Sequence, residues 1–144
     1  MDRQAEFLRT QKPLKEKYRS EPGSSRITLA ARASQQDTPV ACSGDLLLGA
    51  LAACAQVTCQ MVTEAMGIET ELIEVEVEGE LDLAGTLGIS REVPVGFERI
   101  RTRFDVAAPG ATEEQLDALR RKTEQYCVVF QTLTRPPELE TEWA

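Results

Sequence analysis

The segment Ser43–Gly67, SGDLLLGALAACAQVTCQMVTEAMG, decides the fold of this chain. It is apolar nearly all round at its start and amphipathic later, which predicts a long central helix buried on most sides. Ser43 suits the N-cap, Asp45 brings a carboxylate to the positive end of the helix dipole, and Gly67 suits the C′ position. Small residues around Cys54 would let a second helix or a sheet approach closely. We therefore expect Cys54 to lie deep in a packed layer or in an interface.

Two strands are predicted after this helix. Apolar residues alternate with glutamates in Ile73–Leu81 and with arginines and an aspartate in 99–106, and a period of two needs one buried and one solvated face. If the strands pair antiparallel, the two charged stripes share a face, where opposite-charge pairs contribute about 0.2–1 kcal/mol each. We interpret these charges as a solvated face rather than a ligand site. The intervening segment 84–96 holds three glycines and a proline, and we assign no element to it.

The C-terminal third predicts a helix, a further helical turn and a strand. Thr112 with Gln115 is a capping-box signature for a helix through about residue 125. Its inner face is marked by Leu116, Leu119, Thr123 and Tyr126. If 128–133 is a helical turn, Cys127 lies near a helix N-terminus, where amides and the dipole lower a thiol pKa. Alternation in Leu139–Trp143 predicts a last strand.

The N-terminal part is more polar. Residues 1–25 form an arm with a short helix over Pro13–Arg19, and 26–42 hold two short strands of a shortened N-terminal sheet. The order of elements is strand, long helix, two strands, helix and strand, which is α+β. With 144 residues, of which 42% are hydrophobic, the chain is expected to form a single domain over 1–144.

Composition excludes several classes of function. No stretch reaches the roughly 20 apolar residues of a spanning helix, and the first residues carry no apolar signal core, so we expect no membrane segment and a cytoplasmic location. The net charge of −8 argues against nucleic-acid partners. The chain has no histidine, which excludes Ser-His-Asp and Cys-His catalysis, His-containing zinc sites and His-ligated haem.

The four cysteines are the remaining candidates for chemistry. They are Cys42, Cys54, Cys59 and Cys127, and no Cys-x-x-Cys occurs, so we expect no zinc or iron–sulfur site. Taken alone, a cysteine in an apolar helix such as Cys54 is more often a core residue than a nucleophile. Cys59 is about 500° further round the helix, which argues against a disulfide with Cys54. We interpret Cys42 and Cys59 as structural.

Four stretches together carry a family resemblance. They are Asp45–Cys54 (DLLLGALAAC), Ile73–Leu81 leading to GTLG at 85–88, Val93–Phe97 (VPVGF) and Tyr126–Leu133 (YCVVFQTL). Over about residues 40–143 the chain resembles the OsmC/Ohr family of thiol-dependent peroxidases. The resemblance implies an intertwined homodimer, in which antiparallel sheets wrap two central helices and two active sites lie at the subunit interface. It implies no metal and no organic cofactor.

The resemblance also assigns roles to residues. It implies that Cys54 is the peroxidatic cysteine, oxidised to a sulfenic acid, and that Cys127 resolves it to a disulfide, which an external thiol or dithiol then reduces. Relatives support the thiolate with an N-terminal arginine and with a glutamate nine or ten residues before the cysteine. Asp45, nine residues before Cys54, is the candidate carboxylate, although a helix N-terminal charge explains it equally well. Arg19, Arg26 and Arg32 are the candidate arginines.

These implications lead to a functional hypothesis. We expect a hydroperoxide reductase of oxidative-stress defence that prefers organic hydroperoxides, because the surroundings of Cys54 are apolar. A non-catalytic dimer that binds a small apolar ligand at the interface groove or senses oxidants is the alternative, and a structural domain with inert thiols is a third. The redox hypothesis requires Cys54 and Cys127 to lie close together, with Cα atoms within about 7 Å.

Overall fold

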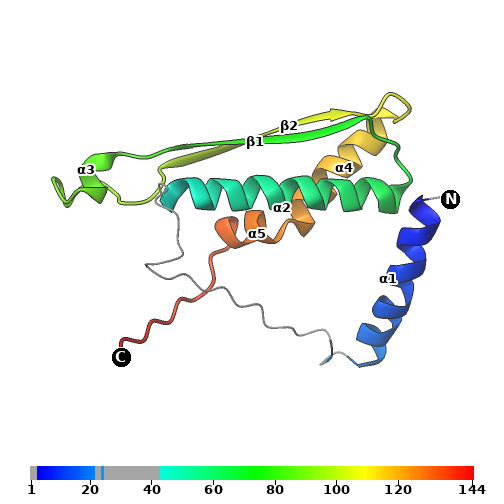
Figure 1. Cartoon of the computed structure of the whole chain (residues 1–144), viewed down its shortest axis with the longest axis horizontal. Coiled ribbons are helices and arrows are strands. Elements are labelled where there is room, and N and C mark those ends of the chain that lie inside the picture. Colours follow the sequence, from blue (N-terminus) through cyan, green and yellow to red (C-terminus); the bar gives the residue numbers. More distant parts are fainter. Residues whose placement is uncertain (1–2, 22–23, 25–42) are drawn as a thin grey trace, which may run out of the picture.

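The structure, a computed structural model, describes residues 3–21, 24 and 43–144. Its elements are α1 (Arg3–Ser20), α2 (Ser43–Met66), β1 (Leu72–Glu80), α3 (Leu83–Thr86), β2 (Arg99–Ala107), α4 (Glu113–Tyr126) and α5 (Val128–Thr134). The helix α2 runs lengthwise under the sheet of β1 and β2, and α4 and α5 pack against other sides of it (Figure 1). The predicted mixture of helices and an antiparallel sheet is confirmed. The two strands predicted within 26–42 lie outside the described residues, as do Arg26, Arg32 and Cys42.

The C-terminal end of α2 is closed by a glycine, as predicted. Gly67 has a φ of +68°, a left-handed conformation that costs glycine little. Its N–H donates to the carbonyl of Glu64 at 3.3 Å, and the N–H of Ile68 donates to the carbonyl of Thr63 at 2.9 Å. Ile68 belongs to the same buried apolar cluster as Val62, which lies in the last two turns of α2. These paired hydrogen bonds and the apolar contact form a Schellman motif, which ends α2 firmly at this point.

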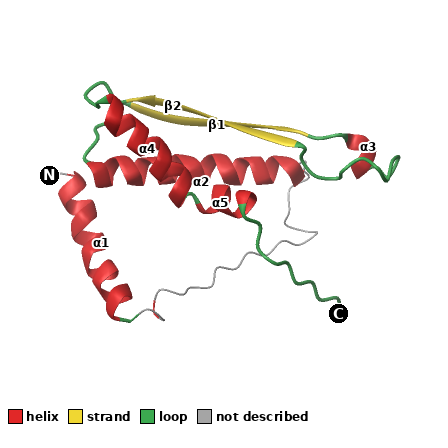
Figure 2. Cartoon of the chain, turned by 180° about the vertical axis from the view of Figure 1, so that it is seen from behind, coloured by secondary structure: helices red, strands yellow, loops and turns green. Residues whose placement is uncertain are grey.

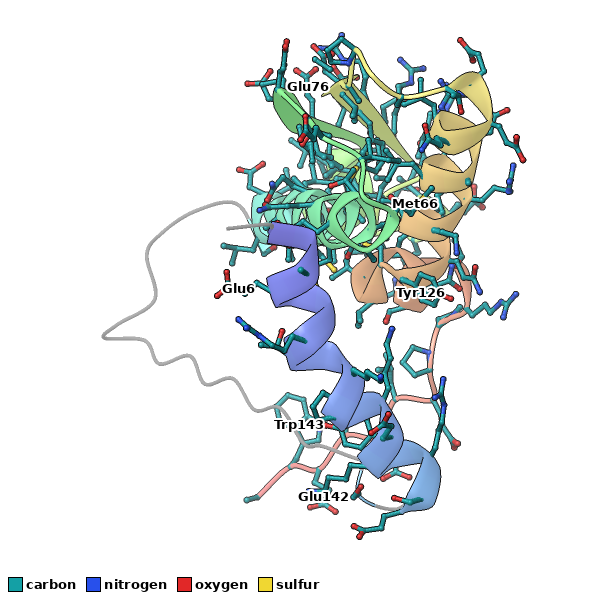
Figure 3. The ribbon with its side chains drawn as sticks, turned by 90° about the vertical axis from the view of Figure 1, so that its right-hand side faces the viewer. Glu6, Met66, Glu76, Tyr126, Glu142 and Trp143 are labelled. Atoms are coloured by element: carbon teal, nitrogen blue, oxygen red, sulfur yellow. The ribbon has the colours of Figure 1, made fainter. Side chains whose placement is uncertain are left out.

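The sheet pairs β1 with β2 antiparallel and confirms the two charged stripes. Three glutamate–arginine pairs lie opposite each other: Glu76 and Arg103, Glu78 and Arg101, and Glu80 and Arg99. Glu76 and Arg103 form an ion pair of 2.6 Å, and Glu76 lies on the face turned away from α2 (Figure 3). Because both side chains are exposed, each such pair contributes little to stability. The alternate residues of both strands face α2 and build the core.

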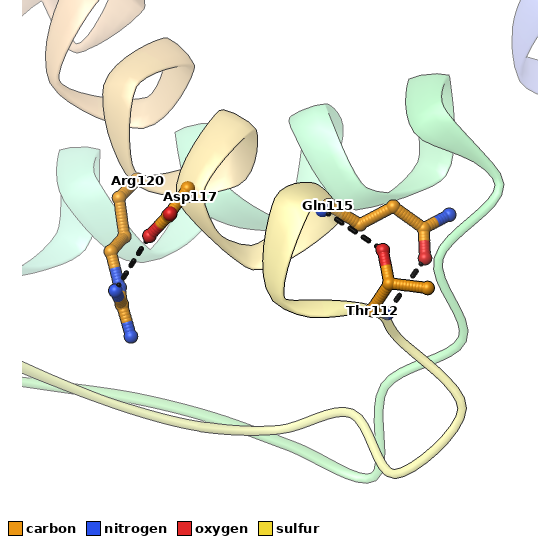
Figure 4. A network of polar contacts seen from close by, with 4 residues as sticks. All are labelled: Thr112, Gln115, Asp117 and Arg120. Atoms are coloured by element: carbon orange, nitrogen blue, oxygen red, sulfur yellow. Dashed lines mark hydrogen bonds and ion pairs between the residues drawn. The ribbon is translucent and has the colours of Figure 1, made fainter.

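Helix α4 begins with the predicted capping box (Figure 4). The Gln115 side chain accepts the N–H of Thr112 at 2.9 Å, and the Thr112 hydroxyl oxygen accepts the N–H of Gln115 at 3.2 Å. On the predicted inner face Leu119 and Thr123 are buried and Leu116 is half-buried. The assignment of Tyr126 to that face is wrong, since it is 58% exposed. Tyr126 is the last residue of α4, and the chain leaves the helix axis directly after it.

Two further predictions need correction near the ends of the chain. The N-terminal helix covers Arg3–Ser20 rather than 13–19 and includes Pro13, because the residues before the proline are mostly good helix formers. The predicted strand Leu139–Trp143 does not form, and Leu139 and Trp143 are 87% and 94% exposed. A strand exists only when it pairs with another, and within the described part of the chain no segment pairs with this one.

The segment between the strands also holds an element that the sequence did not predict. The one-turn helix α3 (Leu83–Thr86) begins at Asp82, whose carboxylate accepts the N–H of Ala84 at 2.9 Å. A single turn is too short to leave an apolar periodicity in the sequence. α3 and the turn after it extend beyond the end of α2 (Figure 2).

The length and composition of α2 would also suit a helix that crosses a membrane. Core helices of soluble proteins pass the same criterion. In this structure the sheet, α4 and α5 pack against part of the surface of α2.

Candidate thiol redox site

Two thiols that are distant in sequence meet beside α2. Cys54 comes from the middle of α2 and Cys127 from the junction between α4 and α5. The Cys127 thiol donates to the Cys54 sulfur, and the two Sγ atoms lie 3.4 Å apart. Both cysteines are free thiols, and a disulfide would require the sulfurs to approach by about 1.4 Å. The predicted proximity of Cys54 and Cys127 is confirmed.

The backbone holds Cys127 from both sides. It is the C-cap of α4 and the N-cap of α5, with extended backbone angles of φ −72° and ψ 110°. Its N–H donates to the carbonyl of Thr123 at 3.0 Å, and its carbonyl accepts the N–H of Gln131 at 2.9 Å. The side chain is 1% exposed and clusters with Leu51 and Ala55 of α2. Cys54 packs against this cluster and is half-buried in the single chain, so of the two predicted positions, a packed layer or an interface, the second stays a prediction.

The Cys54 sulfur is surrounded by hydrogen-bond donors. Burial by itself raises the pKa of its thiol. The backbone N–H of Val129, the Cys127 thiol, the Thr58 hydroxyl and the backbone N–H of Val128 stabilise the thiolate and together outweigh burial, so the pKa of Cys54 is lowered. Cys54 is therefore the thiol of the pair that ionises more easily.

The predicted lowering of the Cys127 pKa is wrong. α5 does begin directly after Cys127, and hydrogen bonds from the backbone N–H groups of Phe130 and Val129 act to lower the pKa of the Cys127 thiol. Burial and the neighbouring Cys54 outweigh these groups, so the pKa of Cys127 is raised. The amides at the start of α5 act on both thiols, those of Val128 and Val129 on Cys54 and those of Val129 and Phe130 on Cys127. Sequence position alone could not show that Cys54 would share them.

The contribution of Thr58 was not predicted from the sequence. It lies four residues after Cys54 in α2, and residues at this spacing lie on the same side of a helix. A hydroxyl one turn from a candidate nucleophile is the signal that could have identified it. The donors from Val128 and Val129 are backbone groups and leave no such signal.

The structure does not bring Asp45 or Arg19 to the sulfur pair. Asp45 is exposed in the first turn of α2, about 13 Å along the axis from Cys54 and on the opposite side of the helix. Arg19 is exposed in the last turn of α1, whereas the end of α1 that lies next to α2 is its N-terminal end (Figure 1). Among the described residues, the groups that shift the Cys54 pKa include no arginine and no carboxylate.

Cys59 stands apart from the pair. It is 2% exposed, and burial raises its pKa. It belongs to a second core cluster with Val62, Ile68 and Leu119. Within the described residues no group of three or more Cys, Asp or Glu side chains is arranged to hold a metal ion.

A helix under an antiparallel sheet, with a thiol pair at its midpoint, defines a mixed α and β protein equipped for cysteine chemistry. Residues 35–142 match the sequence profile of the OsmC-like protein family, and the chain belongs to this family. The crystal structure of an OsmC like protein from Mycoplasma pneumoniae is similar, with a TM-score of 0.58 and 21% sequence identity over 76% of this chain and 73% of that chain. At this identity the similarity concerns the fold. A search of curated proteins finds no match.

Proposed function

We propose that this protein reduces hydroperoxides in oxidative-stress defence, with Cys54 as the peroxidatic and Cys127 as the resolving cysteine. The observation that carries the proposal is the 3.4 Å contact between the two sulfurs, in which Cys54 is the more exposed thiol. The lowered pKa of Cys54 and the raised pKa of Cys127 favour the same division of roles. A thiolate is the nucleophilic form of cysteine, whereas a resolving thiol reacts only after the first step.

The proposed cycle has three steps. The Cys54 thiolate attacks the terminal oxygen of ROOH, the O–O bond breaks, Cys54 becomes a sulfenic acid, and the alkoxide RO⁻ leaves and takes up a proton from solvent to give ROH. The Cys127 sulfur then attacks the Cys54 sulfur, a disulfide forms, and the sulfenic oxygen leaves as water with the Cys127 proton. An external dithiol finally reduces the disulfide and is itself oxidised. No step needs a metal or an organic cofactor.

The surroundings of the pair favour organic hydroperoxides. A groove of about 400 Å³ has an apolar wall that includes Leu47, Leu51, Phe97 and Phe130, and its lining also includes the polar residues Glu98, Arg99, Thr102 and Thr134. Leu51 and Phe130 also belong to the core cluster around Cys127. The groove therefore shares two residues with the cluster that holds Cys127, and its apolar wall would hold the organic part of a hydroperoxide.

We further propose that the protein acts as a soluble, cytoplasmic homodimer with intertwined sheets. One side of α2 presents Leu46, Ala50, Ala53, Val57 and Met61, which recur at helical spacing and are all exposed. A continuous apolar stripe of this kind is typical of a surface that another helix covers. Ala53 is adjacent to Cys54 in the chain, so a second copy would border the redox site and could supply the missing arginine. The roles of Asp45 and of Arg19, Arg26 or Arg32 belong to this proposed dimer.

The proposal is tested by turnover of cumene hydroperoxide and of hydrogen peroxide with dithiothreitol as the reductant. We expect Cys54→Ser to lose activity completely and Cys127→Ser to accumulate a sulfenic acid that dimedone traps. Cys59→Ala is the matched control, because Cys59 lies on the same helix in a separate cluster. It should retain the activity of the wild type. Equal activity of Cys54→Ser and wild type would refute the assignment.

An oxidant sensor is the second candidate, because no arginine among the described residues contributes to the shift of the Cys54 pKa. A sensor would form one Cys54–Cys127 disulfide per chain with peroxide but would not turn over with dithiols. Mass spectrometry after a stoichiometric peroxide pulse, followed by the turnover assay, distinguishes the two functions.

A further inference from the structure

A second cavity lies beside the core cluster of Cys59 and Leu119, which is separate from the cluster around Cys127. It has a volume of about 290 Å³, is lined by residues of α2, β2 and α4, and opens to solvent. Its wall includes Phe104, Leu116 and Leu119 together with two polar side chains, Cys59 and Thr123. Neither Cys54 nor Cys127 lines it. The proposed redox cycle therefore leaves this cavity without a role.

Thr123 presents an unsatisfied hydroxyl to this cavity. Thr123 is 3% exposed, and among the described residues no acceptor meets hydrogen-bond geometry with its Oγ1, the nearby Cys59 sulfur included. Threonines in helices commonly donate to a carbonyl three or four residues earlier. Thr63, Thr132 and Thr134 do so in this protein, at 2.7 to 3.2 Å. A buried hydroxyl without a partner costs free energy, so a group that enters the cavity and accepts its proton would be bound favourably.

Cys59 does not meet this need. It lies beside Thr123, and the hydroxyl would stabilise a Cys59 thiolate. Burial keeps the thiol protonated at neutral pH, and a neutral thiol is a weak acceptor. A buried water molecule typically makes about three hydrogen bonds, and among the described residues the buried side chains of the wall offer these two polar groups alone. The rest of the buried wall is apolar and suits a carbon chain.

The mouth of the cavity favours a neutral guest. Arg120 and Glu124 line it with opposite charges, and Arg120 is already paired with Asp117 at 2.9 Å. A carboxylate would lack a free cation and would face Glu124. The volume is close to the lower end of the roughly 300–1,000 Å³ usual for small-molecule sites.

We propose that the cavity between α2, β2 and α4 binds a small neutral aliphatic molecule carrying one carbonyl or hydroxyl oxygen. The Thr123 hydroxyl donates to this oxygen, and the chain lies against Phe104, Leu116 and Leu119. This site shares no lining residue with the groove of Leu47, Leu51, Phe97 and Phe130, and the proposal does not depend on the peroxidase activity.

The test uses the full-length, reduced protein and two probes, 2-heptanone and cyclohexane, followed by amide chemical shifts. The ketone should give saturable shifts at Cys59, Phe104 and Thr123. Thr123→Val removes the hydroxyl at nearly constant volume and should weaken ketone binding about three- to tenfold, the usual worth of one hydrogen bond. It should leave cyclohexane binding within about twofold, since a hydrocarbon forms no hydrogen bond.

Two further variants keep the result interpretable. Thr123→Ser retains the hydroxyl and should bind the ketone as the wild type does, whereas Leu116→Phe narrows the cavity and should weaken both probes. No saturable shift with either probe, or equal ketone affinity in wild type and Thr123→Val, overturns the proposal. An ordered water that stays bound to Thr123 in the presence of saturating ketone overturns it as well. None of these readouts uses peroxidase activity, so failure of one proposal leaves the other intact.

Discussion

Cys54 and Cys59 occupy the same helix five residues apart, yet they differ in exposure and in the number of hydrogen-bond donors that reach the sulfur. Cys54 is half-buried and meets donors from Thr58, Cys127 and the start of α5, which lower its pKa. Cys59 is 2% exposed in an apolar cluster, and burial raises its pKa. The helix and its apolar composition are common to both. The element packed against each cysteine therefore decides whether a thiol is activated or inert.

The junction between α4 and α5 creates this difference. At Cys127 the chain leaves the axis of α4 and enters α5. Helix α4 covers the C-terminal half of α2, whereas α5 covers the middle of α2. The same change of direction delivers a second thiol and two free amides to Cys54. Cys59 faces the uninterrupted side of α4, where no amide is free.

The largest expected effect is a difference in reactivity between the two thiols. Under iodoacetamide at pH 7, Cys54 should be alkylated on the order of 100 times faster than Cys59, because it is both more ionised and more accessible. Peptide mapping after short pulses, with the two cysteines resolved by protease digestion, measures the ratio.

Denatured protein is the control, since both thiols should then react at similar rates. A ratio near one in the native protein would contradict the contrast between the two sites. Faster alkylation of Cys127 than of Cys54 would reverse the proposed roles instead.

How far the sequence predicts these features depends on how local their causes are. The helix over Ser43–Gly67 and the two strands follow from periodicity, and the start of α4 follows from a capping box contained in four residues. The predicted strand Leu139–Trp143 does not form, because an alternating pattern shows that a segment can pair with a strand but does not show that a partner strand is available. The helix α3 depends on a single Asp82 side chain, a signal too short to stand out.

The candidate site divides in the same way. The family resemblance selected Cys54 and Cys127, and the structure brings these two together. Thr58 could have been found from its spacing, whereas the amides of Val128 and Val129 could not, because every residue carries one. The cavity beside Thr123 was beyond prediction as well, since it arises from three elements meeting.

A second prediction concerns the pH dependence of stability, in which the two thiols act in opposite directions. Folding lowers the pKa of Cys54, so ionisation of this thiol stabilises the folded state. This stabilisation is complete above the ordinary thiol pKa of about 8.5, and it is lost as the pH falls through the lowered pKa of Cys54. The pKa of Cys59 is raised, so its contribution is complete below about 8.5 and is lost as pH rises through the raised value. Each effect is limited to about 1.4 kcal/mol per pH unit.

Urea unfolding from pH 6 to 10, at one protein concentration, measures these slopes. Relative to wild type, Cys59→Ala should lose less stability as the pH rises above 8.5, because it lacks the buried thiol. Cys54→Ala should lack the increase in stability that the wild type shows as the pH rises toward 8.5. Parallel pH profiles for wild type and both variants would show that the two environments do not differ electrostatically.

The smallest predicted effect isolates one donor of the Cys54 site. Thr58→Val removes the hydroxyl that stabilises the thiolate and should raise the pKa of Cys54, so that alkylation at pH 7 slows about three- to tenfold. The pH dependence of the alkylation rate measures this pKa directly. Thr63→Val is the matched control, because the Thr63 hydroxyl lies on the same helix but donates to the carbonyl of Gln60 at 2.7 Å. That variant should lose stability without changing the pKa of Cys54. An equal change of pKa in both variants would mean that loosening of α2, rather than the hydroxyl at position 58, controls the thiol.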